Sequence, residues 1–66
     1  MKPIYMTYRK YGNSWEECVP SRTLAEARGF ARMAKSDDAA GTYKVKKIMV
    51  SEGEYDILCS EYGLEA

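Results

Sequence analysis

Three basic side chains have the spacing of a binding surface. On a helix, Arg28 and Arg32 are neighbours four residues apart, and Lys35 continues the same side. Gly29 and Ala25 lie among them and would leave the helix backbone open to close approach. This pattern predicts a basic helix that docks on an acidic protein surface or on a phosphate backbone. An ordinary solvated helix face with a tolerated glycine is the alternative interpretation.

A second set of residues combines aromatic and basic side chains on candidate strands. Tyr5, Arg9 and Tyr11 fall on one side of an alternating segment, and Lys44 and Lys46 alternate in a later one. If the two strands are neighbours, their open face would resemble sheets that stack single-stranded nucleic acid. The alternative is that tyrosine is simply favoured in strands. Trp15 and Cys18 are interpreted as packing residues.

The residue types that catalysis usually needs are missing from the sequence. There is no histidine, and Cys18 and Cys59 are too few for a four-ligand zinc site. Glu16 and Glu17 are neighbours on a predicted strand and would point to opposite faces of it. Asp37 and Asp38 would lie in solvent near the end of a helix, so neither pair is arranged for catalysis. The glycines are scattered and form no phosphate-binding loop. We therefore expect no enzymatic activity, no metal and no cofactor.

Size, charge and cysteine content limit the classes of function further. The 66 residues suffice for a single small domain over residues 1–66, with ten basic and ten acidic side chains. The segment from Arg22 to Lys47 is mainly basic, and the chain after Lys47 carries acids and no base. Two cysteines are few for a small secreted domain, so a reducing cytoplasm is expected. No stretch approaches the roughly 20 apolar residues of a membrane span.

The N-terminal segment is typical of a β-hairpin. Residues from Pro3 to Tyr11 alternate, and Gly12-Asn13 suits a two-residue type II′ turn. This turn fixes the register, and Pro20 is expected to end the second strand. The predicted cross-strand pairs are Tyr11 with Ser14, Lys10 with Trp15, Arg9 with Glu16, and Met6 with Val19.

A helix is predicted from Leu24 to about Lys35 or slightly beyond. Thr23 and Glu26 form a capping box at its start, and Gly41 follows its end. Its apolar side, which is expected to lie on a sheet, consists of Leu24, Ala27, Phe30, Ala31 and Ala34.

The C-terminal part is interpreted as two further strands. Thr42 to Val50 forms the third, with a bulge near Lys46-Lys47 that turns Ile48 inward; without it, Ile48 and Val50 lie on the outer face. Tyr55 to Cys59 forms a short fourth strand, and residues from Ser60 on are expected to fray. The predicted fold is α+β, with strand order 2-1-3-4 in an antiparallel ββαββ sheet and one helix on one face. The cysteines would then lie too far apart to pair.

With these elements placed, the chain resembles the small phage-encoded anti-CRISPR proteins of ββαββ build that act on type I-F surveillance complexes. The resemblance runs from about Met1 to Leu58. It is carried by Met1-Lys2, Tyr5, Leu24, Ala27, Arg28, Ala31, Gly41-Thr42, Val45, Ile48 and Gly53.

The resemblance implies a non-catalytic inhibitor that sits on backbone subunits of the CRISPR effector and blocks target DNA by occlusion. Tyr5 and Arg28 match positions expected to contact the complex, and we add Arg32 and Lys35 from the helix pattern. The chain departs from the family at Gly29, where a second base is usual, and at Met33.

A second resemblance, and a second kind of function, stay open. Val19-Pro20, Thr23-Leu24 and Glu26-Ala27 are similar to a phage inhibitor of bacterial RNA polymerase. Single-stranded nucleic-acid binding on the sheet is the other alternative, with Arg9, Tyr11, Lys44 and Lys46 as a secondary surface. In each case we expect a protein of the host bacterial cytoplasm, monomeric and without a membrane partner.

Overall fold

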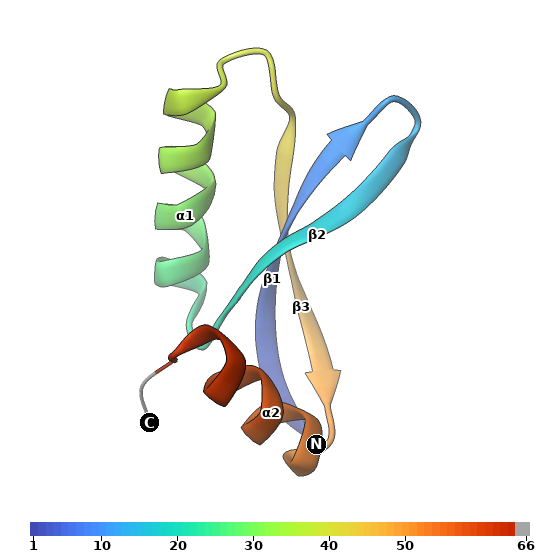
Figure 1. Cartoon of the computed structure of the whole chain (residues 1–66), viewed down its shortest axis with the longest axis vertical. Helices are drawn as coiled ribbons and strands as arrows, with labels where there is room; N and C mark the ends of the chain where they lie inside the picture. Colours follow the sequence, from blue (N-terminus) through green and yellow to red (C-terminus); the bar gives the residue numbers. More distant parts are fainter. Residues whose placement is uncertain (65–66) are drawn as a thin grey trace.

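A three-stranded antiparallel sheet and two helices make up residues 1–64, the part of the chain that the computed structural model describes. The elements are β1 (Lys2–Tyr11), β2 (Ser14–Ser21), α1 (Leu24–Asp37), β3 (Tyr43–Val50) and α2 (Glu52–Tyr62). The strand order is β2-β1-β3, with α1 along one side of the sheet and α2 across its lower end (Figure 1). The α+β class, the central position of β1 and the antiparallel neighbours are as predicted.

The hairpin follows the predicted register from its turn to the middle of the strands. Gly12 has a φ of 59°, as the first central residue of a type II′ turn requires, and the three pairs nearest the turn are confirmed. The register then shifts between Thr7 and Tyr8, because β2 carries an extra residue at Cys18. Met6 consequently lies opposite Pro20, and the predicted pairing of Met6 with Val19 is wrong.

Helix α1 begins where its capping box predicts, but it covers the other face of the sheet. The Thr23 hydroxyl accepts a hydrogen bond from the Glu26 amide at 3.2 Å. Ala27 is fully buried, and its carbonyl accepts a hydrogen bond of 3.5 Å from the Thr7 hydroxyl. The face of β1 that carries Tyr5, Thr7 and Arg9, which was predicted to be open, is therefore the α1 face. A small alanine lets the helix approach closely enough to satisfy the buried threonine hydroxyl.

The predicted fourth strand is wrong, because its residues form helix α2. The Ser51 hydroxyl accepts a hydrogen bond from the Glu54 amide at 3.2 Å, and Gly63 ends the helix with a φ of 63°. The Leu64 amide donates to the Cys59 carbonyl at 2.9 Å, which completes a glycine-type cap. The predicted fraying from Ser60 on is wrong as far as Tyr62, and residues 65–66 lie outside the described part.

Helix α2 covers the side of the sheet opposite α1. Ile4 and Met6 are buried there, and Met6 lines a groove together with Ile57 and Leu58 of α2. Because neighbouring residues of a strand point to opposite sides, this α2 face is the reverse of the one that carries Thr7.

Strand β3 pairs with β1 without interruption, so the predicted bulge near Lys46-Lys47 is wrong. Ile48 and Val50 lie on the α2 face, opposite to the side of Tyr43 and Val45. This was the alternative prediction for β3, and α2 explains why these apolar residues are not left in solvent.

Within residues 1–64, no helix has both the length and the apolar character needed to cross a membrane. Cys18 and Cys59 are both free thiols, but the predicted reason is wrong, because Cys59 lies on helix α2 and not on an edge strand of the sheet.

Candidate functional site

The outer side of α1 presents a pair of free arginines. Arg28 and Arg32 are both exposed, and neither forms a hydrogen bond or an ion pair with another residue of the described chain. Gly29 lies between them, and a Cβ atom placed there would meet nothing within 4 Å. We call Arg28 and Arg32 the α1 arginine surface. Its two guanidinium groups are available to a partner, and the backbone beside them is uncovered.

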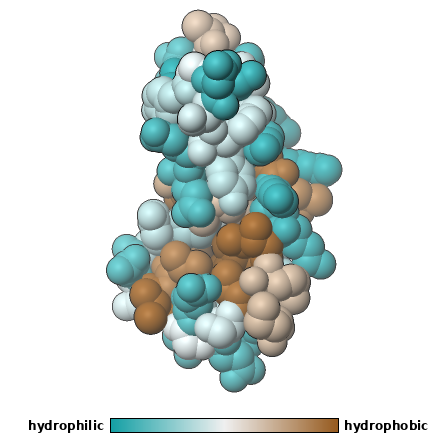
Figure 2. All heavy atoms as spheres, turned by 90° about the vertical axis from the view of Figure 1, so that its right-hand side faces the viewer, coloured by the Kyte–Doolittle hydropathy of each residue, from teal (hydrophilic) through white to brown (hydrophobic). Residues whose placement is uncertain are grey.

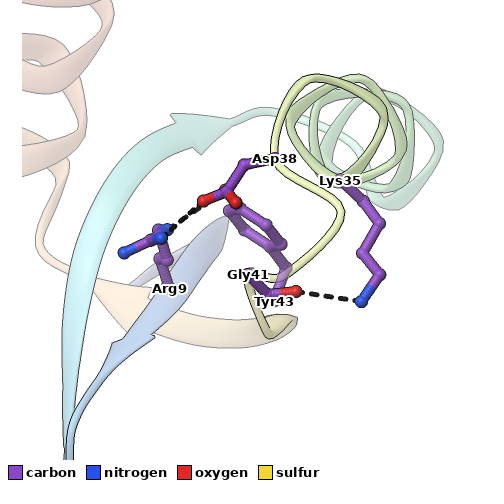
Figure 3. Close-up of polar contacts among 5 residues, drawn as sticks. All are labelled: Arg9, Lys35, Asp38, Gly41 and Tyr43. Carbon is purple, nitrogen blue, oxygen red and sulfur yellow. Dashed lines mark hydrogen bonds and ion pairs between the residues drawn. The ribbon is translucent and has the colours of Figure 1, made fainter.

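The other two predicted contact residues have different surroundings. The Lys35 ammonium donates a hydrogen bond of 2.9 Å to the Gly41 carbonyl, which ties the end of α1 to the following loop (Figure 3). Tyr5 is half-buried on the α1 face of the sheet, opposite Ser21 and Lys47. The structure thus brings Arg28 and Arg32 together, whereas Lys35 already has an internal partner and Tyr5 lies on the sheet.

The Arg9 side chain links β1 to the loop between α1 and β3. Its guanidinium donates to the Asp38 carboxylate and, at 3.2 Å, to the Tyr43 hydroxyl (Figure 3). It also lies 4.1 Å from the centroid of the Tyr11 ring. The loop packs tightly here, since a Cβ atom on Gly41 would come within 2.7 Å of the Tyr43 ring. These contacts give Arg9 a structural role at the end of the molecule where α1 stops.

The ion pair between Arg9 and Asp38 predicts a stability change in acid. The hydrogen bond and the positive charge of Arg9 lower the pKa of Asp38. Such a carboxylate stabilises the fold above its unfolded pKa of about 3.9, and this contribution disappears as the pH falls through the folded pKa. Asp38→Asn is therefore expected to weaken the fold at pH 7 and to lose less stability than the wild type below about pH 4.

Urea unfolding at a series of pH values measures this difference. Asp37→Asn is the matched control, because Asp37 is an exposed neighbour with no side-chain hydrogen bond among the described residues. The control should keep the acid dependence of the wild type. An Asp38→Asn variant with the same acid dependence would show that the ion pair contributes nothing measurable.

The sheet face that helix α2 covers in part also carries a cluster of aromatic and lysine side chains, which lies outside the part covered by the helix. The Lys44 ammonium lies 4.1 Å from the centroid of the Trp15 ring and 5.7 Å from that of Tyr8, and the Lys10 ammonium lies 6.0 Å from the Trp15 centroid. Lys46 pairs with Met6 on the same face. We call this set the tryptophan–lysine cluster; its members are Tyr8, Lys10, Trp15, Lys44 and Lys46.

The predicted secondary surface is therefore divided between two faces. Arg9 and Tyr11 lie on the α1 face, whereas Lys44 and Lys46 lie on the α2 face. Trp15, interpreted from the sequence as packing, is instead 38% exposed and in contact with lysine. Strand alternation together with the confirmed pairing of Lys10 with Trp15 was the signal that would have found it.

Beside this cluster, the α2 face is apolar. A groove of about 200 Å³ is lined by Met6, Glu17, Ile48, Val50, Glu54, Ile57 and Leu58. Figure 2 shows this side of the molecule, with apolar surface gathered in its lower half and mainly polar surface above. The groove is part of the contact between α2 and the sheet, and Ile57 remains 58% exposed.

No group of three or more His, Cys, Asp or Glu side chains within residues 1–64 is arranged to hold a metal ion. Comparison with known proteins gives no matching family model, no similar curated protein and no similar solved structure.

Proposed function

We propose that the protein is a non-catalytic inhibitor that binds a bacterial CRISPR surveillance complex through the α1 arginine surface and blocks access of target DNA. The anti-CRISPR resemblance suggests the partner, and the helix supplies the surface. The observation that carries the proposal is the exposure of Arg28 and Arg32, which have no hydrogen-bond or ion-pair partner in residues 1–64.

The chemistry of this surface favours a negatively charged partner. Like charges four residues apart on a helix destabilise it by roughly 0.2–0.5 kcal/mol, and a bound anion would relieve that repulsion. Guanidinium groups also bind carboxylate and phosphate oxygens through two parallel hydrogen bonds. An acidic protein surface beside the channel that binds nucleic acid offers carboxylates, and the nucleic acid in that channel offers phosphates.

The distribution of charge supports one orientation of the protein on its partner. Helix α2, on the opposite face of the sheet, carries Glu52, Glu54, Asp56 and Glu61 and no basic residue. A negatively charged partner would attract the α1 arginine surface and repel helix α2 itself, so the protein would dock with α1 inward and with α2 turned away from the partner. In this proposal the protein acts as a monomer in the host cytoplasm and needs no cofactor.

Target-DNA binding by a purified type I-F surveillance complex tests the proposal. Pre-incubation with a stoichiometric amount of the protein should abolish the shift of labelled target DNA in a gel, and the protein should co-elute with the complex in size exclusion. Unchanged DNA binding without co-elution would overturn the proposed function.

A further inference from the structure

We propose that the tryptophan–lysine cluster binds single-stranded nucleic acid, with Trp15 as the surface on which a base stacks. The cluster lies on the α2 face, on the side of the sheet opposite α1. It is therefore separate from the α1 arginine surface, and the inference does not rest on the proposed function.

All three strands contribute to this site. Trp15 comes from β2, Tyr8 and Lys10 from β1, and Lys44 from β3. The Lys44 side chain extends across β1, since its own pairing partner is Tyr8 but its ammonium lies 4.1 Å from the Trp15 ring centroid. The sheet thus places an indole, a phenol and two ammonium groups side by side on one surface.

The charge of this surface is complementary to phosphate. Lys10, Lys44 and Lys46 are exposed, and none of them forms an ion pair with a residue of the described chain. Glu17 lies on the same face, opposite Tyr8, and is the acid nearest to them in the strand pairing. The lysines outnumber it, and alternating aromatic and basic groups are the recurrent means of holding single strands.

Stacking can displace the lysine that now covers the indole. An exposed contact between an ammonium and an aromatic ring is weaker than the stacking of a base on tryptophan. An incoming base would therefore replace the Lys44 ammonium at the ring, and the released ammonium would pair with a neighbouring phosphate. Bases inside a duplex cannot reach the ring in this way, so the site selects single strands.

Trp15 is the only tryptophan of the chain, so its fluorescence reports on the site directly. Titration of the full chain with oligothymidylate at low salt should quench the emission. Anisotropy of a labelled oligothymidylate should show binding that is roughly 5- to 150-fold weaker for Trp15→Ala, and closer to the wild type for Trp15→Phe. Absence of quenching at low salt would overturn the inference.

Lysine variants separate stacking from general attraction to polyanions. If three lysines neutralise phosphates, the logarithm of the affinity should fall with that of the salt concentration with a slope of about −2. The pair Lys44→Gln/Lys46→Gln should reduce this slope to about −0.7. Lys47→Gln is the matched control, because Lys47 lies on the same strand but pairs with Tyr5 on the α1 face.

Two further outcomes are decisive. Binding of oligothymidylate and of heparin with equal affinity and without a change in Trp15 emission would mean electrostatic attraction alone, and would overturn the stacking site. The variant Arg28→Glu/Arg32→Glu should keep the quenching, although it removes the α1 arginine surface. A failure of this inference can thus be told apart from a failure of the proposed function.

Discussion

If the proposed function is right, the double variant Arg28→Glu/Arg32→Glu is expected to bind the CRISPR surveillance complex at least about 100-fold more weakly than the wild type. Removing one partner of a buried charge-assisted contact at an interface costs about 2–5 kcal/mol, and each reversal also places a negative charge against an acidic partner. The fold should be little affected, because both side chains are exposed and contact no other described residue through a hydrogen bond or ion pair. Isothermal titration and thermal unfolding of the same preparation measure the two effects.

The control for this variant is a double charge reversal on the opposite face, Lys44→Glu/Lys46→Glu. It changes the net charge by the same amount but lies on the α2 face. Binding of the surveillance complex should stay close to that of the wild type. If both double variants weaken binding equally, the affinity depends on overall charge, and α1 is not the docking surface.

Ile4→Ala is expected to have the largest effect on stability, a loss of about 2–5 kcal/mol. Ile4 is fully buried on the central strand and lies opposite Ile48 of β3. Truncation of the side chain leaves a cavity on the α2 face of β1, and the few neighbouring core residues cannot move far enough to fill it. A domain of this size has only about 3–5 kcal/mol of stability, so the variant should be largely unfolded at 25 °C. Urea titration followed by circular dichroism measures the loss.

Ile57→Ala is the matched control for this prediction. Ile57 is 58% exposed on α2, so truncation of the same side-chain type should cost less than about 1 kcal/mol. Equal destabilisation by the two substitutions would contradict the conclusion that Ile4 belongs to the core and Ile57 to the surface. It would also indicate that α2 is packed more tightly than its exposure suggests.

Local signals in the sequence predicted the N-terminal half of the fold well. The alternation of β1, the turn at Gly12 and the cap at Thr23 depend on interactions within a few residues, and all three are found in the structure. The same kind of signal was present before α2. Ser51 and Glu54 repeat the spacing of Thr23 and Glu26, but the short apolar run after them was interpreted as a strand.

The remaining errors concern tertiary choices that local patterns do not determine. The bulge at Cys18 changes the register only beyond the predicted pair of Arg9 with Glu16, so nothing in the turn reveals it. The face that α1 covers depends on the fit of Ala27 over the Thr7 hydroxyl, which is a contact between residues 20 apart in the sequence. Once α1 takes that face, the apolar side of β1 needs a second cover, and α2 supplies it.

The candidate site was predicted in part. The exposure of Arg28 and Arg32 followed from helical spacing. The apolar side of α1 faces the sheet whichever of the two sheet faces the helix covers, so the arginines point away from the sheet in both cases. Of the tryptophan–lysine cluster, only Lys44 and Lys46 were predicted as surface residues. Their grouping with Trp15 was missed, because it depends on which side of the sheet each residue of the three strands faces. Arg9 was predicted as a surface residue, but its pairing with Asp38 depends on a loop whose path the sequence did not show.

Site-specific photo-crosslinking tests most directly whether α1 is the docking surface. A benzophenone amino acid at Ala25, an exposed position on the same side of α1 as Arg28 and Arg32, should crosslink to a protein subunit of the surveillance complex. The same group at Thr42, an exposed residue of the loop before β3, should give little crosslinked product. Efficient crosslinking from Thr42 and none from Ala25, with both variants bound to the complex, would contradict docking through α1.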